Sequence, residues 1–390
     1  MRLGIMTMGC ALSCALWLGA CSDDDSDGSH ENDASENTAG GGAAGRSAAG
    51  RGGAGGATAS AAKVDRAAFE ATGLNKYLGK AKPAETQTEG DEAHYFFDEA
   101  DGPVCIRGER FAMATRDRGA DDLMIYLQGG GSCTTALCRA TETANPQIPA
   151  YGVLNRDDTD NPVADWNVVF SPYCDGSLHF GDADIPDQNR KHHGLRNVSA
   201  ALDVARDKFP NPRRALLTGA SAGGYATIWM TSLVRLIYPD AELFVFNDAG
   251  IAISNPASPD GFRDVLGEWG AQQFIPEDCD DCRSTPHLTA WMSWNLKHDP
   301  TLTQSMFSSY EDSVIAGTFL MLDPQIFKQE LLDQTAKVVD SAPDRAKRFL
   351  VEGTQHTAGN IHTTAVGELP IAQWLEQMIE RDEAWDNQLQ

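Results

Sequence analysis

Residues 214–236 read RALLTGASAGGYATIWMTSLVRL and give the strongest indication of the fold. Its apolar first part predicts a short buried strand, and the pattern over 222–238 predicts a helix. Between them lies Gly219-x-Ser221-x-Gly223, whose glycines let the strand and the helix pack closely. Such a turn lifts the Ser221 hydroxyl clear of the backbone and places it at the helix N-terminus, where free N–H groups carry partial positive charge. The stretch therefore predicts a nucleophilic serine. The alternative is a Gly-rich turn between strand and helix that has no catalytic role.

Short apolar β-rich runs alternate with helical patterns along the rest of the chain, which is typical of a mostly parallel sheet flanked by helices. The expected strands are 111–115, 123–127, 168–170, 215–218, 243–246, 306–309 and 349–351. The expected helices are 194–208, 222–238, 287–297, 324–339 and 369–383. Because the serine turn joins one such strand to one such helix, we expect a single-domain α/β-hydrolase fold over residues 63–390.

A second glycine-rich turn follows the expected strand 123–127 and reads Gln-Gly-Gly-Gly-Ser over residues 128–132. In α/β-hydrolases, a turn after an early strand supplies part of the oxyanion hole. We expect the main-chain N–H groups of Gly130, Gly131 and Ala222 to be the donors. A phosphate-binding loop is the alternative, but this loop lacks the G-x-x-x-x-G-K-[ST] pattern.

A serine nucleophile needs a base, and histidine has a suitable pKa near neutrality. In α/β-hydrolases the acid and then the histidine follow the serine along the chain. The histidines after the serine are His287, His298, His356 and His362. Only His356 follows an expected apolar strand at short distance, so it is our first choice. His362 is the fallback, and a solvated loop histidine is the alternative for both.

The acid of the triad has three candidates. The expected strand 306–309 is followed by two adjacent carboxylates, Glu311 and Asp312, and the preceding strand is followed by Asp248. We choose Asp312 first, Glu311 second and Asp248 third. The alternative is that Asp312 only caps a helix over 313–319.

The N-terminal region carries the features of export. Residues 1–20 begin with a basic residue, continue in an apolar run and end in small residues, which predicts a signal peptide. Cys21 follows directly, as in the lipobox of bacterial lipoproteins, and residues 21–62 form an acidic Gly-, Ala- and Ser-rich tether that is expected to be disordered. We expect a lipid anchor at Cys21 and attachment to the bacterial cell envelope, at the outer membrane or surface. Secretion with Cys21 as an incidental thiol is the alternative.

Cysteine content and charge indicate which bonds and binding partners to expect. Six cysteines lie in the expected domain, which suggests three disulfides among about 15 pairings; they are Cys105, Cys133, Cys138, Cys174, Cys279 and Cys282. The net charge is −25 and no Lys/Arg cluster stands out, so we expect no nucleic-acid partner. With no metal-ligand pattern, we expect neither metal nor cofactor, and we expect a monomer.

Four segments resemble, in order and spacing, the pectin acetylesterase/Notum family. They are 127–133 (LQGGGSC), 173–176 (YCDG), 219–224 (GASAGG) and 247–250 (NDAG). The segment 353–356 is similar to that family's histidine region, and the resemblance spans about residues 97–374. It implies an α/β-hydrolase that removes acyl groups from oxygen: plant members act on acetylated pectin, and Notum removes a fatty acyl group from a signalling protein.

The resemblance also implies roles for individual residues. Ser221 corresponds to the nucleophile, His356 to the base, and the backbone after Gly129 to the oxyanion donors. It implies the disulfides Cys105–Cys174 and Cys133–Cys138, which leaves Cys279–Cys282 as the third pair. The family's Tyr-Asp acid motif appears here as Tyr310-Glu311-Asp312, so the register of the acid stays open.

We therefore expect a serine carboxylesterase that cleaves O-acyl, chiefly O-acetyl, esters on a polysaccharide. The alternatives are a short-chain carboxylesterase, a lipid or polyester hydrolase, and a catalytically inactive surface-binding lipoprotein.

Overall fold

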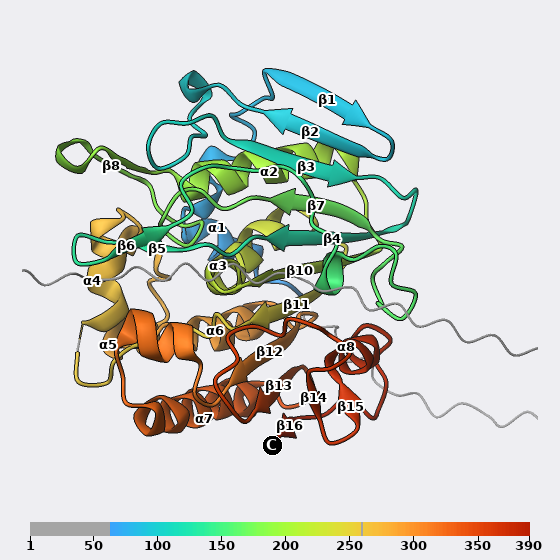
Figure 1. Cartoon of the computed structure of the whole chain (residues 1–390), viewed down its shortest axis with the longest axis vertical. Helices are drawn as coiled ribbons and strands as arrows, with labels where there is room; N and C mark the ends of the chain where they lie inside the picture. The colour runs from blue at the N-terminus through green and yellow to red at the C-terminus, as the bar shows by residue number, and fades with distance from the viewer. Residues whose placement is uncertain (1–62, 259) are drawn as a thin grey trace, which may run out of the picture. The chain divides into compact units, whose positions relative to one another are not determined.

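The computed structural model describes residues 63–258 and 260–390. The expected signal peptide, the expected lipidation site Cys21 and the expected tether lie outside the described residues. The described residues are organised around a ten-stranded sheet with the order β1-β2-β3-β7-β4-β10-β11-β12-β13-β16 (Figure 1). Its strands are β1 (Glu85–Glu89), β2 (Glu92–Phe96), β3 (Ala112–Arg116), β4 (Asp122–Leu127), β7 (Asn167–Ser171), β10 (Arg214–Ala220), β11 (Glu242–Asp248), β12 (Thr303–Ser309), β13 (Ala346–Val351) and β16 (Gln388–Leu389).

The sheet is mostly parallel, as predicted. Strands β7, β4, β10, β11, β12, β13 and β16 run parallel, and the antiparallel β1, β2 and β3 extend the sheet beyond β7. All seven expected strands are present, most of them longer by one to three residues. Because parallel strands end at the same edge, the residues that follow β4, β10, β11, β12 and β13 gather there.

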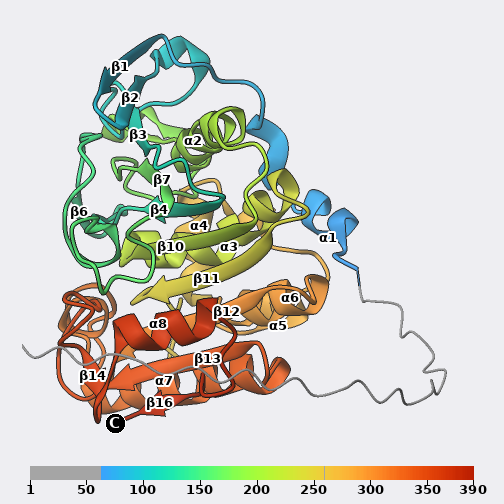
Figure 2. The ribbon, with the colours of Figure 1, turned by 90° about the vertical axis from the view of Figure 1, so that its right-hand side faces the viewer.

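Alternate residues of each strand face opposite sides of the sheet and build two separate cores. In β4, Leu123 and Ile125 pack with the helices α2 and α3, whereas Met124 and Tyr126 belong to the second core. The first face is covered by α2 (Gly194–Lys208), α3 (Ala222–Ile237), α6 (Ala290–His298) and α7 (Pro324–Ser341). The second is covered by α8 (Ile371–Ile379) and by the segment 148–166 (Figure 2).

Shorter elements surround this sheet. They are α1 (Arg66–Ala71), α4 (Gly261–Glu268), α5 (Asp280–Ser284), the π-helix η6 (Ser313–Leu320), and the hairpins β5–β6 (Gly131–Cys133, Cys138–Ala140), β8–β9 (Ala183–Ile185, Arg190–His192) and β14–β15 (Ala365–Val366, Leu369–Pro370). Three helices differ from expectation: the helix expected at 287–297 begins at Ala290, the one expected at 369–383 is shortened to α8, and 313–320 forms a π-helix. Within the described residues, no helix is both long and apolar enough to span a membrane.

Three disulfides join Cys105 to Cys174, Cys133 to Cys138 and Cys279 to Cys282. These are the pairs that the family resemblance implies. Cys133–Cys138 closes the β5–β6 hairpin directly after the glycine-rich turn, and Cys105–Cys174 anchors the segment that follows β7. Both therefore brace the backbone around the expected oxyanion hole.

Candidate active site

Ser221 occupies a strained turn between β10 and α3. Its backbone has φ 57° and ψ −119°, a conformation that non-glycine residues rarely adopt and that costs about 1–3 kcal/mol. The flanking glycines are required by close packing. A Cβ on Gly223 would lie 1.8 Å from the carbonyl oxygen of Leu127, and one on Gly219 would lie 2.7 Å from the Gly223 backbone. The serine thus stands at the N-terminus of α3, as the sequence predicts.

Asp248, at the end of β11, links the serine turn to the loop that carries His356. The main-chain N–H of Ser221 donates to the carbonyl oxygen of Asp248 at 2.9 Å. The Asp248 carboxylate Oδ1 accepts the main-chain N–H of Ala358 at 2.8 Å. One residue therefore contacts both segments, although its carboxylate binds the histidine loop rather than the imidazole.

His356 is paired with Asp312. Its Nδ1 lies 2.8 Å from Asp312 Oδ2 and 3.0 Å from Oδ1, and the Asp312 carboxylate is fully buried. The opposite ring nitrogen, Nε2, is buried and has no hydrogen-bond partner. Asp312 Oδ1 also accepts the N–H groups of Val314 and Ile315 at 2.9 and 2.8 Å. Asp312 was expected either to pair with the histidine or to cap the helix that follows it. In the structure it does both, because it contacts His356 and caps η6.

The structure places the remaining histidine and acid candidates elsewhere. Glu311 is half-buried, and its main-chain N–H donates to the carbonyl of Gly353. His362 contacts Asp158 at 2.5 Å on the surface. His287 contacts Ser254 and Glu330. His298 contacts Asp65 and Asp278. Among residues 63–258 and 260–390, no three His, Cys, Asp or Glu side chains are grouped to hold a metal ion.

The glycine-rich turn after β4 lies against Ser221. A Cβ on Gly129 would approach the Cβ of Ser221 to 3.0 Å, so this backbone is in direct contact with the nucleophile turn. The carbonyl of Gly130 accepts the N–H of Thr141 at 2.8 Å, and Gly131 begins the β5–β6 hairpin with φ 85°. Ala222 is the first residue of α3, where N–H groups lack partners within the helix. Gly129, which was not among the expected donors, is the glycine of this turn whose Cβ would meet Ser221.

His179 holds this turn in place through a hydrogen bond. Its Nε2 donates to the carbonyl of Gln128 at 2.8 Å, and the side chain is completely buried. Burial lowers the pKa of His179, which favours the neutral ring. In a planar trans peptide the carbonyl and the following N–H point in opposite directions. The bond therefore fixes the Gly129 N–H away from His179. Only tertiary packing brings His179 here, so no sequence signal identifies it.

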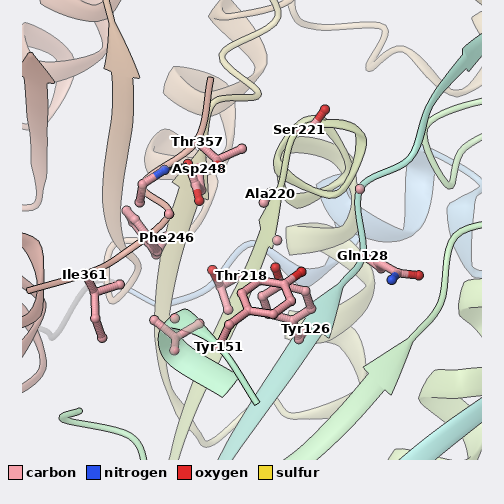
Figure 3. Close-up of a pocket in the computed structure, with 16 residues that line it drawn as sticks. Tyr126, Gln128, Tyr151, Thr218, Ala220, Ser221, Phe246, Asp248, Thr357 and Ile361 are labelled. Carbon is pink, nitrogen blue, oxygen red and sulfur yellow. Dashed lines mark hydrogen bonds between the residues drawn. The ribbon is translucent and has the colours of Figure 1, made fainter. Parts of the chain in front are cut away.

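Ser221 lines two cavities. The smaller, of about 230 Å³, runs beneath the serine turn and is bounded by Tyr126, Tyr151, Thr218 and Asp248 (Figure 3). The larger, of about 710 Å³, has largely apolar walls that include Phe262, Val265, Ile315, Phe319 and Leu320.

Asp248 and Tyr225 are among the titratable groups near the site whose pKa values are shifted. Burial raises the pKa of Asp248 to about 7, against the lowering effects of the Ala358 N–H and of His356. The pKa of Tyr225, in the first turn of α3, is raised by burial and by the charge of Asp312. Asp312 and the helix that follows Ser221 are therefore close enough to interact electrostatically.

Comparisons with known proteins identify the family of the chain. The family model described as Pectinacetylesterase matches residues 87–289. Pectin acetylesterase 4 of Arabidopsis thaliana is 28% identical over 182 residues, which are 41% of this chain and 44% of that protein. Pectin acetylesterase 11 of the same plant is 27% identical over 203 residues, which are 46% and 52% of the two chains. The chain thus spans about half the length of the curated relatives it matches.

The matched range contains Gly129, Ser221 and Asp248 but ends before Asp312 and His356. The pairing of the last two therefore rests on geometry alone. The family model covers just over half of the chain, including the serine turn and the glycine-rich turn. The chain belongs to the pectinacetylesterase family.

Proposed function

We propose that this protein is a serine carboxylesterase that removes O-acyl groups, chiefly acetyl, from a polysaccharide. The observation that carries the proposal is the pair formed by the buried Asp312 and the half-buried His356. The Nε2 atom of His356 has no hydrogen-bond partner, and the loop that carries His356 is linked through Asp248 to the Ser221 turn. The family membership supports the same reaction, since the matched relatives are named pectin acetylesterases.

In the proposed acylation step, the Ser221 hydroxyl attacks the ester carbonyl carbon while His356 Nε2 accepts its proton. Asp312 holds Nδ1–H and stabilises the imidazolium that forms. The tetrahedral intermediate collapses when His356 returns the proton to the leaving alcohol. A water molecule, deprotonated by His356, then attacks the acyl-enzyme and releases the carboxylic acid together with free Ser221.

The proposed oxyanion hole uses main-chain N–H groups on both sides of the serine. One donor is the main-chain N–H of Ala222, at the start of α3. The other is a main-chain N–H of the glycine-rich turn, from Gly129, Gly130 or Gly131. Gly129 is the glycine in closest contact with the Ser221 turn, and Gly131 lines the larger cavity. Loss of one such donor costs about 3–4 kcal/mol of transition-state stabilisation.

A second candidate, favoured by the larger cavity, is a carboxylesterase or lipid or polyester hydrolase that accepts longer acyl chains. A volume of about 710 Å³ with apolar walls is far more than an acetyl group needs. Hydrolysis of p-nitrophenyl esters from acetyl to palmitoyl separates the two candidates. A maximum at acetyl supports the acetylesterase, and a maximum at a longer chain supports the alternative.

A catalytically inactive surface-binding protein is the alternative outside enzymes. Labelling with a fluorophosphonate distinguishes it, because this reagent reacts with an activated serine. We expect the label on Ser221 in the folded protein, and none in the Ser221→Ala variant. Absence of label from the folded wild type would reject the esterase.

We also propose that the protein is exported and anchored through a lipid on Cys21. The three disulfides fit an exported protein, because such bonds persist in oxidising compartments. Metabolic labelling with a palmitate analogue tests the anchor. Incorporation that disappears in Cys21→Ala is expected, and equal incorporation in both proteins would contradict it.

A further inference from the structure

The reacting groups of the proposed mechanism face the larger of the two cavities. Figure 3 shows the Ser221 hydroxyl directed away from the smaller cavity. Among the described residues, Gly131 and Ala222, two of the proposed oxyanion donors, line the larger cavity and not the smaller one. An ester that reacts at Ser221 is therefore expected to bind in the larger cavity.

The larger cavity has walls of two different kinds. The helices α4 and η6 contribute apolar side chains, among them Phe262 and Phe319. The β5–β6 hairpin contributes the polar side chains of Ser132, Thr134 and Arg139. An O-acyl ester likewise has an apolar acyl group and a polar alcohol, and ligand sites match such differences with placed polar groups. The acyl group therefore fits the wall of α4 and η6, and the alcohol fits the hairpin.

Arg139 is the one charged side chain among the described residues that line this cavity. It is exposed and, within residues 63–258 and 260–390, its guanidinium forms no hydrogen bond or ion pair. Acidic residues outnumber basic ones by 56 to 31 in the chain, so acidic partners are abundant. Two arginines near the same hairpin are paired: Arg107 Nη2 lies 2.9 Å from Glu142 Oε1. Arg190 Nη1 lies 3.8 Å from Glu268 Oε1. The Arg139 guanidinium, by contrast, is available to a substrate.

The hairpin fixes the backbone of Arg139 beside the proposed oxyanion hole. Arg139 is directly opposite Ser132 in the β5–β6 pair, so the two side chains project to the same face, and both line the cavity. A Cβ on Gly131 would lie 1.9 Å from the carbonyl oxygen of Arg139, so the main chains of these two residues are in contact. The Cys133–Cys138 disulfide closes the hairpin between them. The guanidinium therefore extends into the cavity from a braced position next to an oxyanion donor.

We infer that Arg139 binds a carboxylate carried by the alcohol part of the substrate, next to the acyl group that reacts at Ser221. A planar guanidinium and a carboxylate form two parallel N–H···O bonds, which fix the position of the ligand as well as neutralising its charge. In an O-acylated polysaccharide, such a carboxylate belongs to a uronic-acid residue. The inference rests on the proposed esterase function and assigns Arg139 as the residue that distinguishes uronic-acid polymers from neutral ones.

The test compares three substrates: p-nitrophenyl acetate, acetylated polygalacturonate as the anionic polymer, and acetylated glucomannan as the neutral one. Arg139→Gln keeps a polar side chain and removes the charge. It should raise KM for polygalacturonate about 3- to 10-fold, as expected for a partly exposed charged pair, and leave kcat unchanged. KM for glucomannan and for p-nitrophenyl acetate should not change.

Two further substitutions at the same position separate charge from shape. Arg139→Lys keeps the charge but loses the paired donors, so its KM for polygalacturonate should lie between those of the wild type and Arg139→Gln. Arg139→Glu should raise this KM further, because like charges repel. At an ionic strength of about 1 M, where the screening length is about 3 Å, the differences among these variants should shrink.

Arg213→Gln is the matched control. Arg213 is also an exposed arginine, but it precedes β10, at the opposite end of this strand from Ser221, and pairs with Asp122 at 2.7 Å. Within the described residues it lies outside the walls of both cavities. The variant should leave the KM values for all three substrates unchanged.

Three outcomes would overturn the inference while leaving the esterase intact. The first is an Arg139→Gln variant with the wild-type KM for polygalacturonate. The second is an equal rise in KM for polygalacturonate and glucomannan, which would show that Arg139 does not recognise a carboxylate. The third is a wild type that hydrolyses glucomannan but not polygalacturonate. Failure of the wild type to hydrolyse p-nitrophenyl acetate would instead reject the proposed function itself.

Discussion

The main-chain N–H of Ser221 donates a hydrogen bond of 2.9 Å to the main-chain carbonyl of Asp248. The side chain of the same aspartate accepts the N–H of Ala358, two residues beyond His356. The end of β11 therefore holds two segments that are far apart in sequence in a fixed relation. A carboxyl group is buried at this junction, and burial raises its pKa to about 7.

This raised pKa predicts how stability depends on pH. A carboxyl group with a folded-state pKa above its unfolded value of 3.8 contributes stability that is complete below pH 3.8 and is lost as the pH rises through about 7. Asp248→Asn keeps an acceptor for Ala358 but has no proton to lose. The variant should therefore gain stability relative to wild type between pH 5 and pH 8. Each tenfold difference in proton affinity between the folded and unfolded states corresponds to about 1.4 kcal/mol.

Denaturant unfolding of both proteins at pH 5 and pH 8 measures this difference. The gap in unfolding free energy should favour the variant more at pH 8 than at pH 5. The same gap at both pH values would mean that Asp248 titrates alike in the folded and unfolded states.

Asp312 is predicted to serve as the acid of the triad as well as a helix cap. Asp312→Asn keeps an oxygen for the N–H groups of Val314 and Ile315 but removes the charge next to His356. We expect kcat for p-nitrophenyl acetate to fall roughly 10³- to 10⁴-fold, as when the same role is lost in a serine protease. The melting temperature should change little.

Glu311→Gln is the matched control, because it neutralises the adjacent carboxylate. It should retain nearly full kcat. If Glu311→Gln lost activity and Asp312→Asn kept it, the roles of the two residues would be reversed.

The larger cavity predicts the range of acyl chains. Gly317 lines it, and a Cβ at this position would meet no heavy atom within 4 Å, so a larger side chain can enter the cavity without a clash. Gly317→Leu should therefore lower kcat/KM for hexanoyl relative to acetyl esters by about tenfold, the burial of one to two methylene groups. An unchanged ratio of the two esters would show that the acyl chain does not enter this cavity.

The parallel strands and the serine turn could be predicted from sequence because their signals are local. Apolar runs mark β4, β10 and β11, and the glycines around Ser221 are demanded by packing against Leu127. Strands β1 and β2 were missed. All five residues of β1 (ETQTE) are exposed, so this strand has no apolar face and is held by its pairing with β2.

The candidate site could be predicted only in part, because several of its contacts are long-range. Two adjacent carboxylates follow β12, and only the turn that starts η6 decides that Asp312 rather than Glu311 is directed at His356. His179 reaches the carbonyl of Gln128 across 51 positions of sequence. No local pattern encodes such a contact.

Hydrolysis of p-nitrophenyl acetate by the purified protein and by its Ser221→Ala variant asks whether Ser221 is the nucleophile. Loss of the hydroxyl removes the covalent step, so the variant should retain the fold, judged by its circular dichroism spectrum, and lose activity by roughly 10⁶-fold. A folded Ser221→Ala variant that hydrolyses the ester at the wild-type rate would contradict the serine mechanism.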